Sequence, residues 1–197
     1  ANGSGKSTLL KSLLGADAIE QGEILGDGVP IVRDDSWRRT IAYLPQRPFL
    51  GERSSAREAF VLFGAPVENS TMRHWLERLA LWDVLARKNS DDPLSTRVGA
   101  LSSGERQRLA LARFFSLDRD TYLLDEPDAN LDAAGVAAVV EIVAELAKTK
   151  RVIVAAHTPE LVRVGRTVLE LEDGRARNPS EPVNVLRRAD NPLQGDA

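Results

Sequence analysis

The sequence predicts an α/β fold with a mainly parallel sheet, a small antiparallel β-part and a helical subdomain. Three observations support this prediction. Short apolar runs such as Tyr122–Leu124 and Arg151–Ala156 alternate with segments of helical periodicity, which is typical of buried parallel strands joined by helices. Glycines separate short apolar stretches between Gly22 and Val32, which indicates a hairpin or meander. Residues 54 to about 90 repeat apolar side chains at helical spacing, which predicts the helical subdomain.

Leucines on one face predict a first helix at Lys6–Leu14, which Gly15 ends. The same criteria predict further strands at 40–44, 122–124, 151–156 and 167–171, and further helices at 103 to about 117 and 133–148. We expect one domain over residues 1–175, with the helical subdomain at about 54–118. Prolines, arginines and polar residues dominate from Gly174 onward, and they predict a poorly ordered polar tail at 176–197.

The composition is that of a soluble globular protein. Of the 197 residues, 43% are hydrophobic and 28% are charged, which is enough apolar material for a core. The formal net charge of -3 is spread along the chain and does not favour a nucleic-acid partner, which calls for a basic domain. The sequence contains no cysteine, which excludes disulfides and thiolate metal sites. No apolar run approaches the ~18 residues that span a bilayer.

The first eight residues, Ala1–Thr8, read ANGSGKST, which is a P-loop without its first glycine. Glycines let backbone N–H groups approach phosphate oxygens, and the following helix turns its positive end toward the anion. Lys6 is expected to reach the β- and γ-phosphates, and the Ser7 hydroxyl to bind Mg²⁺. A Gly/Ser-rich turn before an ordinary helix is the alternative, which the complete Gly-Lys-Ser-Thr ending disfavours. The expected nucleotide-binding residues are Asn2, Gly3, Ser4, Gly5, Lys6, Ser7 and Thr8.

Two adjacent carboxylates, Asp125 and Glu126, follow the apolar run that ends at Leu124. Ligands of open α/β sheets bind at the carboxyl ends of the strands. Asp125 is therefore expected to hold Mg²⁺ beside the P-loop, and Glu126 to face the water that attacks the γ-phosphate. A solvated acidic turn is the alternative, and the upstream P-loop disfavours it because magnesium–ATP needs an acidic partner. The fold is thus expected to be built on a P-loop NTPase core.

Four further elements follow in a fixed order. Gln46 comes after the strand at 40–44, and Leu101–Arg108 reads LSSGERQR at the start of a helix. Ala129–Asp132 comes after the acidic pair, and His157 ends the strand at 151–156. Together with the P-loop, these elements resemble the Q-loop, signature, D-loop and switch histidine of the ABC ATPase superfamily. The resemblance covers about residues 1–175.

The resemblance implies the nucleotide-binding domain of an ABC transporter, which binds ATP and Mg²⁺ and hydrolyses ATP between two cassettes. It implies that Ser102, Ser103 and Gly104 contact the ATP held by the partner cassette. The other implied nucleotide contact is Asp132 of the D-loop. The implied metal-binding residues are Ser7, Gln46 and Asp125, and the implied catalytic residues are Glu126, His157, Gln46 and Lys6.

Two positions depart from the family pattern, and single residues have simpler interpretations. Ser103 stands where the signature has its first glycine, and Glu105 stands where it has glutamine. Taken alone, Gln46 fits a surface amide and His157 a hydrogen-bonded histidine at a strand end. Ser102 fits a helix N-cap whose capping box Glu105 completes.

Transport is the leading hypothesis for the kind of ABC protein. Lys6 and Asp125 are too close in the chain for the long coiled coil of the chromosome-maintenance relatives, and a single cassette is present. The stretches Leu44–Leu50 and Ser95–Gly99 resemble exporter and peroxisomal fatty-acyl cassettes, which favours export. The glutamate that exporters carry after that glycine is absent here. The candidates to meet a coupling helix are Arg47, Phe49 and Leu50; the alternative is a hydrophobic loop packed on the helical subdomain.

The expected partners are a second cassette, identical or different, and a transmembrane domain, fused or separate, with no direct nucleic-acid contact. The expected location is the cytoplasmic face of a membrane, the bacterial inner membrane. A soluble ABC ATPase acting on nucleic acid or ribosomes is one alternative. A catalytically inactive regulatory cassette is another, which the intact Lys6, Asp125, Glu126 and His157 disfavour. We also expect the native chain to extend upstream of Ala1, because the first P-loop glycine, the entering strand and the family's adenine-stacking aromatic residue are missing.

Overall fold

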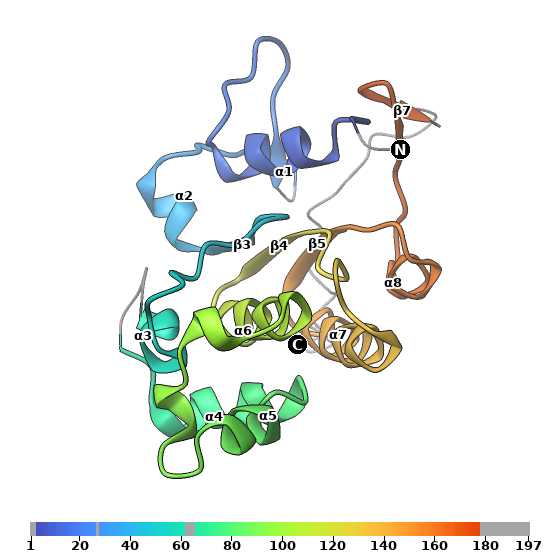
Figure 1. Ribbon diagram of the computed structural model, residues 1–197. Coiled ribbons are helices and arrows are strands. Elements are labelled where there is room, and N and C mark those ends of the chain that lie inside the picture. The colour runs from blue at the N-terminus through green and yellow to red at the C-terminus, as the bar shows by residue number, and fades with distance from the viewer. Residues whose placement is uncertain (1–2, 27, 62–65, 178–197) are drawn as a thin grey trace, which may run out of the picture. The chain divides into compact units, whose positions relative to one another are not determined.

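The computed structural model describes residues 3–26, 28–61 and 66–177 (Figure 1). The chain divides into two compact units. The sheet unit comprises Ala1–Tyr43, Arg119–Asp125 and Ile142–Ala197, and the helical unit comprises Leu44–Asp118 and Glu126–Glu141.

A three-stranded sheet in the order β3-β4-β5 forms the centre of the sheet unit. Strand β4 pairs with β5 in parallel, so that Thr121 lies opposite Arg151 and Asp125 opposite Ala155. The strands β1 and β2 form one antiparallel pair, and β6 and β7 form another. The strands are β1 (Leu25–Gly26), β2 (Val29–Pro30), β3 (Ile41–Leu44), β4 (Thr121–Asp125), β5 (Arg151–Ala155), β6 (Glu170–Glu172) and β7 (Arg175–Arg177). The helices of this unit are α1 (Lys6–Leu14), α2 (Asp35–Arg39) and α8 (Pro159–Val164).

Helix α1 packs its leucine face on the sheet. Leu10 and Leu13 form a buried cluster with Ile41, Leu123 and Ala155 from the three central strands. Every residue of β4 is buried, as its continuous apolar run predicts for a parallel strand. The sheet therefore holds the carboxyl end of β4 in a fixed place in this unit.

The helical unit is built around α6 (Ser103–Phe115), which packs against two preceding helices, α3 and α4 (Figure 1). Its core consists of leucines with no exposed surface, among them Leu76, Leu79 and Leu109. The ring of Trp75 lies 5.5 Å from that of Phe115. The other helices are α3 (Ala56–Val61), α4 (Asn69–Arg78), α5 (Trp82–Lys88) and two short 3₁₀ helices, η1 (Pro93–Ser95) and η2 (Val98–Ala100). Helix α7 (Ala133–Leu146) begins in this unit.

The predicted fold class is confirmed, and most predicted elements fall within a few residues of their observed bounds. The structure adds α2 and α8, which are too short for apolar periodicity to reveal. Helix α2 has five residues, and its N-cap is Asp34, whose carboxylate accepts the N–H of Trp37. The last predicted strand begins at Glu170 instead of residue 167. Residues 176 and 177 belong to β7, and the rest of the predicted tail lies outside the described residues.

Leu109→Ala is expected to lower the free energy of unfolding by about 2–5 kcal/mol, because it leaves a cavity where a side chain of α6 is completely buried. Urea denaturation measures the change. Val61→Ala on α3 is the control, since Val61 is 36% exposed, and it should change stability by less than about 1 kcal/mol. Equal stabilities of the two variants would contradict the packing around α6.

Candidate functional site

The P-loop lies in the sheet unit, with its glycines in conformations that other residues avoid. Gly3 has a φ of 88° and Gly5 a φ of 95°, both in the left-handed region. Between them Ser4 is buried, and its hydroxyl accepts a hydrogen bond of 3.1 Å from Lys6 Nζ. Gly5 is the N-cap of α1 and offers no side chain to its N–H groups, which leaves these donors for an anion. Asn2 lies outside the described residues.

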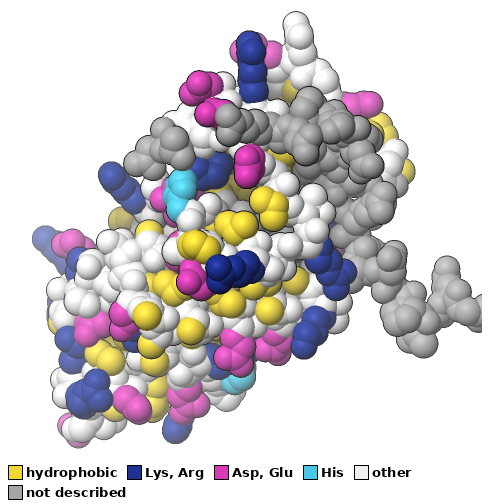
Figure 2. Space-filling model, turned by 90° about the vertical axis from the view of Figure 1, so that its right-hand side faces the viewer, with side chains coloured by type: hydrophobic (Ala, Val, Ile, Leu, Met, Phe, Trp, Pro, Cys, Tyr) yellow, Lys and Arg dark blue, Asp and Glu magenta, His cyan; other side chains and the backbone are white. Residues whose placement is uncertain are grey.

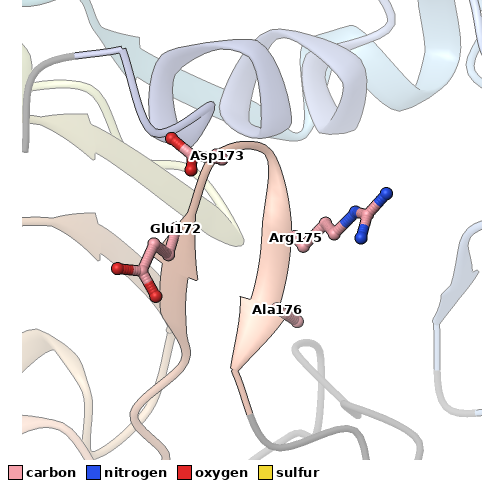
Figure 3. A pocket seen from close by; sticks show the side chains of 4 residues that line it. All are labelled: Glu172, Asp173, Arg175 and Ala176. Atoms are coloured by element: carbon pink, nitrogen blue, oxygen red, sulfur yellow. The ribbon is translucent and has the colours of Figure 1, made fainter.

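The turn between β6 and β7 supports the P-loop from outside. The N–H of Gly174 donates to the carbonyl oxygen of Ser4 at 3.2 Å, and Gly174 has a φ of 74°. Figure 3 shows this turn beside the start of α1. An open pocket of about 430 Å³ lies on the hairpin, lined by Glu172, Asp173, Arg175 and Ala176. Two carboxylates and one guanidinium thus line this pocket.

Asp125 ends β4 with an exposed fraction of only 2%. Its Oδ1 is buried and has no hydrogen-bond partner among the described residues. Burial and, after it, the charge of Asp125 raise the pKa of the Tyr43 hydroxyl, which marks the electrostatic influence of this carboxylate. A buried carboxylate oxygen without a partner is costly, whereas a cation would stabilise it.

Mg²⁺ prefers a few oxygen ligands and keeps several waters, which fits this surrounding. The half-buried Ser7 hydroxyl supplies a second oxygen in the same unit. No cluster of three or more His, Asp or Glu side chains suited to a metal occurs among residues 3–26, 28–61 and 66–177. The residues present therefore fit a largely hydrated Mg²⁺ on Asp125 and Ser7.

Glu126 opens a tight turn in the helical unit. It has a φ of 50°, and its carbonyl oxygen accepts the N–H of Ala129 at 3.1 Å. Gln46 Nε2 donates to Glu126 Oε2 at 2.6 Å. The structure thus brings together two predicted catalytic residues that lie 80 positions apart in the sequence.

The signature segment begins α6 with a complete capping box. Ser102 Oγ accepts the N–H of Glu105 at 3.2 Å, and Glu105 Oε2 accepts the N–H of Ser102 at 2.8 Å. The capping interpretation is therefore correct. Glu105 Oε2 also lies 3.4 Å from Lys88 Nζ, so the carboxylate that replaces glutamine has a cationic neighbour. Ser102 and Ser103 are exposed at the helix start.

Asp132 ends the D-loop and caps α7. Its Oδ1 accepts the N–H of Gly135 at 2.8 Å and a hydrogen bond from Arg108. The N–H of Gly135 and then Arg108 hold the pKa of Asp132 below its usual value. Asn130 has a φ of 61°, in the left-handed region that asparagine tolerates.

The predicted residues fall into two groups. The P-loop, Asp125 and the exposed His157, two residues past β5, belong to the sheet unit. Gln46, Glu126, the signature and the D-loop belong to the helical unit. Sequence reasoning missed three residues that contact these elements, because no local pattern links them to their partners: Lys88, Arg108 and Gly174.

The loop after Gln46 exposes only part of the predicted coupling surface. Arg47 is exposed and Phe49 is 66% exposed, but Leu50 is 5% exposed and packs inside the helical unit. Arg113 holds the loop by donating to the Phe49 carbonyl oxygen at 2.9 Å, and burial lowers the pKa of Arg113. Leu50 is thus a core residue, as the alternative of a packed loop implies.

Comparisons with known proteins agree with these elements. The family model described as ABC transporter matches residues 1–129. The glutathione/L-cysteine transport system ATP-binding/permease protein CydC of Escherichia coli is 30% identical over 188 residues, covering 94% of this chain and 33% of that protein. The cytochrome c biogenesis ATP-binding export protein CcmA of Aromatoleum aromaticum is 34% identical over 175 residues, covering 87% of this chain and 79% of that protein.

The structure of a bacterial Atm1-family ABC exporter with ATP bound matches with a TM-score of 0.80 and 26% identity, over 90% of this chain and 32% of that chain. The chain spans about a third of the length of CydC and of that exporter. In the described part of the chain, no helix has both the length and the apolar character needed to cross a membrane. From the family match, the relatives and the shared α/β fold, the chain belongs to the ABC transporter family, as an ATP-binding ATPase domain.

Proposed function

We propose that this chain hydrolyses MgATP as the motor of a membrane transporter, with export the favoured direction. The observation that most directly supports metal-dependent hydrolysis is the buried, unpartnered Oδ1 of Asp125 in the same unit as the P-loop. The relatives carry different substrates in their names, glutathione or L-cysteine for CydC and mycobactin for IrtB of Mycolicibacterium smegmatis. The ATPase domain therefore does not specify the cargo.

The P-loop binds the triphosphate through backbone N–H groups at Gly3–Gly5 and the positive end of α1. Lys6 Nζ, which contacts Ser4 Oγ in the free loop, turns to the β- and γ-phosphates. Ser7 and Asp125 would hold Mg²⁺, which would neutralise charge at the phosphates. Charge on the phosphates is thus balanced by a side chain, a helix end and a cation.

Glu126 is the general base. Its carboxylate accepts a proton from the attacking water while its neighbour Asp125 is committed to the cation. Gln46 donates to Glu126 from Nε2, and its Oε1 is the end of the amide suited to Mg²⁺. His157 follows β5 and serves as the hydrogen-bond donor to the γ-phosphate.

The signature acts on the ATP of a second cassette. The exposed Ser102 and Ser103 start a helix of 13 residues, and such a helix end suits phosphate. Gly104 and Asp132 complete this contact, as the family resemblance implies. The capping box satisfies Ser102 within the chain and leaves its hydroxyl proton available as a donor.

Arg47 and Phe49 form the surface offered to a transmembrane partner at the cytoplasmic face of a membrane. Phe49 is a large exposed apolar side chain, and Arg113 fixes the backbone beneath it. A nucleic-acid partner has less support, because Lys and Arg side chains lie among Asp and Glu side chains on the face shown in Figure 2.

Glu126→Gln is expected to lower ATP turnover by about 10²-fold or more while ATP binding is retained, because the amide cannot accept a proton. Phosphate release and nucleotide binding measure the two effects. Glu141→Gln on the exposed surface of α7 is the matched control and should keep normal turnover. Turnover of the Glu126 variant within a few-fold of wild type would exclude Glu126 as the base.

Action of the signature in trans predicts complementation between two inactive variants. Lys6→Ala removes the phosphate contact and Ser102→Arg blocks the signature. A mixed dimer has one site with both defects and one intact site, so mixing should restore part of the ATPase activity. If mixed dimers form, as crosslinking can show, and activity stays absent at every ratio, the signature does not act in trans.

A further inference from the structure

One face of α6 contacts the segment that carries the general base. Gly104, Gln107 and Arg108 are spaced i, i+3 and i+4, so they share one side of the helix. All three lie against residues 126–132, the D-loop segment. This segment belongs to the same helical unit as α6. The contacts span both ends of that segment.

The first two contacts are made to backbone carbonyl groups. Gln107 is 5% exposed, and its Nε2 donates to the carbonyl oxygen of Pro127 at 3.2 Å. Pro127 directly follows Glu126 in the chain. At Gly104, an added Cβ would lie 2.9 Å from the carbonyl oxygen of Asn130, so only glycine allows this approach. Helix and segment are therefore in direct backbone contact.

The third contact is an ion pair between Arg108 and Asp132. The Arg108 side chain is 15% exposed, and its other amino group donates to the carbonyl oxygen of Ala80 at 3.4 Å. Asp132 also caps α7, so one carboxylate joins α6 to the start of α7. A largely buried guanidinium with two acceptors holds a defined position and is more than a surface charge.

The D-loop segment is held at its first residue by Gln46, which donates to Glu126 Oε2, and along the rest of its length by the three contacts with α6. Asn130 and Asp132 are exposed, and Glu126 and Asn130 both adopt left-handed backbone conformations. Such a segment takes its position from the elements that hold it. A displacement of α6 would act on the D-loop segment through these three contacts, and the contact at Pro127 lies next to Glu126 in the chain.

We infer that α6 and the D-loop segment move as one body, and that Arg108 is a positioning residue that couples the signature to Glu126. This inference rests on the proposed function, in which Ser102 contacts the ATP of the partner cassette. Through this coupling, ATP bound to the partner cassette determines the position of Glu126 in this chain's own ATP site.

A double-mutant cycle tests the coupling between Arg108 and Asp132, and it is measured in the full-length protein that carries this domain. Arg108→Met removes the guanidinium and keeps the length of the side chain. Asp132→Asn keeps an acceptor for the Gly135 N–H and removes the charge. Each variant should lower kcat by about 10-fold with the KM for ATP within about 2-fold, and the double variant should also lose only about 10-fold instead of about 100-fold.

The matched control is the exposed ion pair of Arg73 and Glu77 on α4. Arg73→Met and Glu77→Gln should leave kcat within about 2-fold of wild type. Combined with Glu126→Gln, Arg108→Met should still form the ATP-bound dimer, because the signature contact itself remains. Loss of that dimer would show that Arg108 supports docking and would overturn the positioning role.

The possible failures are distinguishable. Absence of ATPase activity in the wild type would refute the proposed function. An active wild type in which the Arg108 and Asp132 effects multiply, or in which kcat is unchanged, would refute the coupling alone. If Arg108→Met does not fold, Arg108→Lys keeps the charge and loses the second acceptor contact, and kcat should then fall by about 3-fold. Wild-type kcat in Arg108→Lys and Asp132→Asn would likewise refute it.

Discussion

The burial of β4 is the constraint on which the site depends. All five of its residues are buried, between β3 and β5 in the sheet order and against the leucines of α1. A strand buried in this way can end in a carboxylate only where something compensates the charge. Asp125 stands at that end with an unpartnered oxygen, in the unit that also contains the phosphate loop. The packing of the apolar side chains and the burial of the Asp125 carboxylate are thus two consequences of one strand.

The shape of the P-loop depends on glycines with left-handed backbone conformations. Gly3 and Gly5 have left-handed φ angles, and Gly174 supports the loop by donating to the Ser4 carbonyl oxygen. Gly174 reaches this place because the β6–β7 hairpin turns there. The loop therefore holds its shape by its own backbone and by one distant turn, and the Lys6 ammonium lies at the loop, 3.1 Å from Ser4 Oγ.

Many of the helices and strands could be predicted from the sequence, because they depend on residues that are close together in the chain. Helix α1, the buried strands and the start of α6 follow from periodicity or from residues within four positions of each other. Ser102 and Glu105 form their capping box as their spacing predicts. The contact of Lys88 with Glu105 and that of Arg108 with Asp132 could not be predicted, because they depend on how helices pack. Leu50 was misjudged for the same reason, since its burial depends on the helices around it.

The departure of the signature from its usual pattern also has a physical explanation within the chain. Ser103 is exposed at the first position of α6, so a side chain there meets solvent. Gly104 is different, because any Cβ would collide with the carbonyl oxygen of Asn130. The segment Ser102–Gly104 thus departs from the family signature at Ser103, where a side chain reaches solvent. It keeps glycine at position 104, where the D-loop backbone lies close. The requirement for glycine at position 104 arises from the chain's own backbone, before any nucleotide is considered.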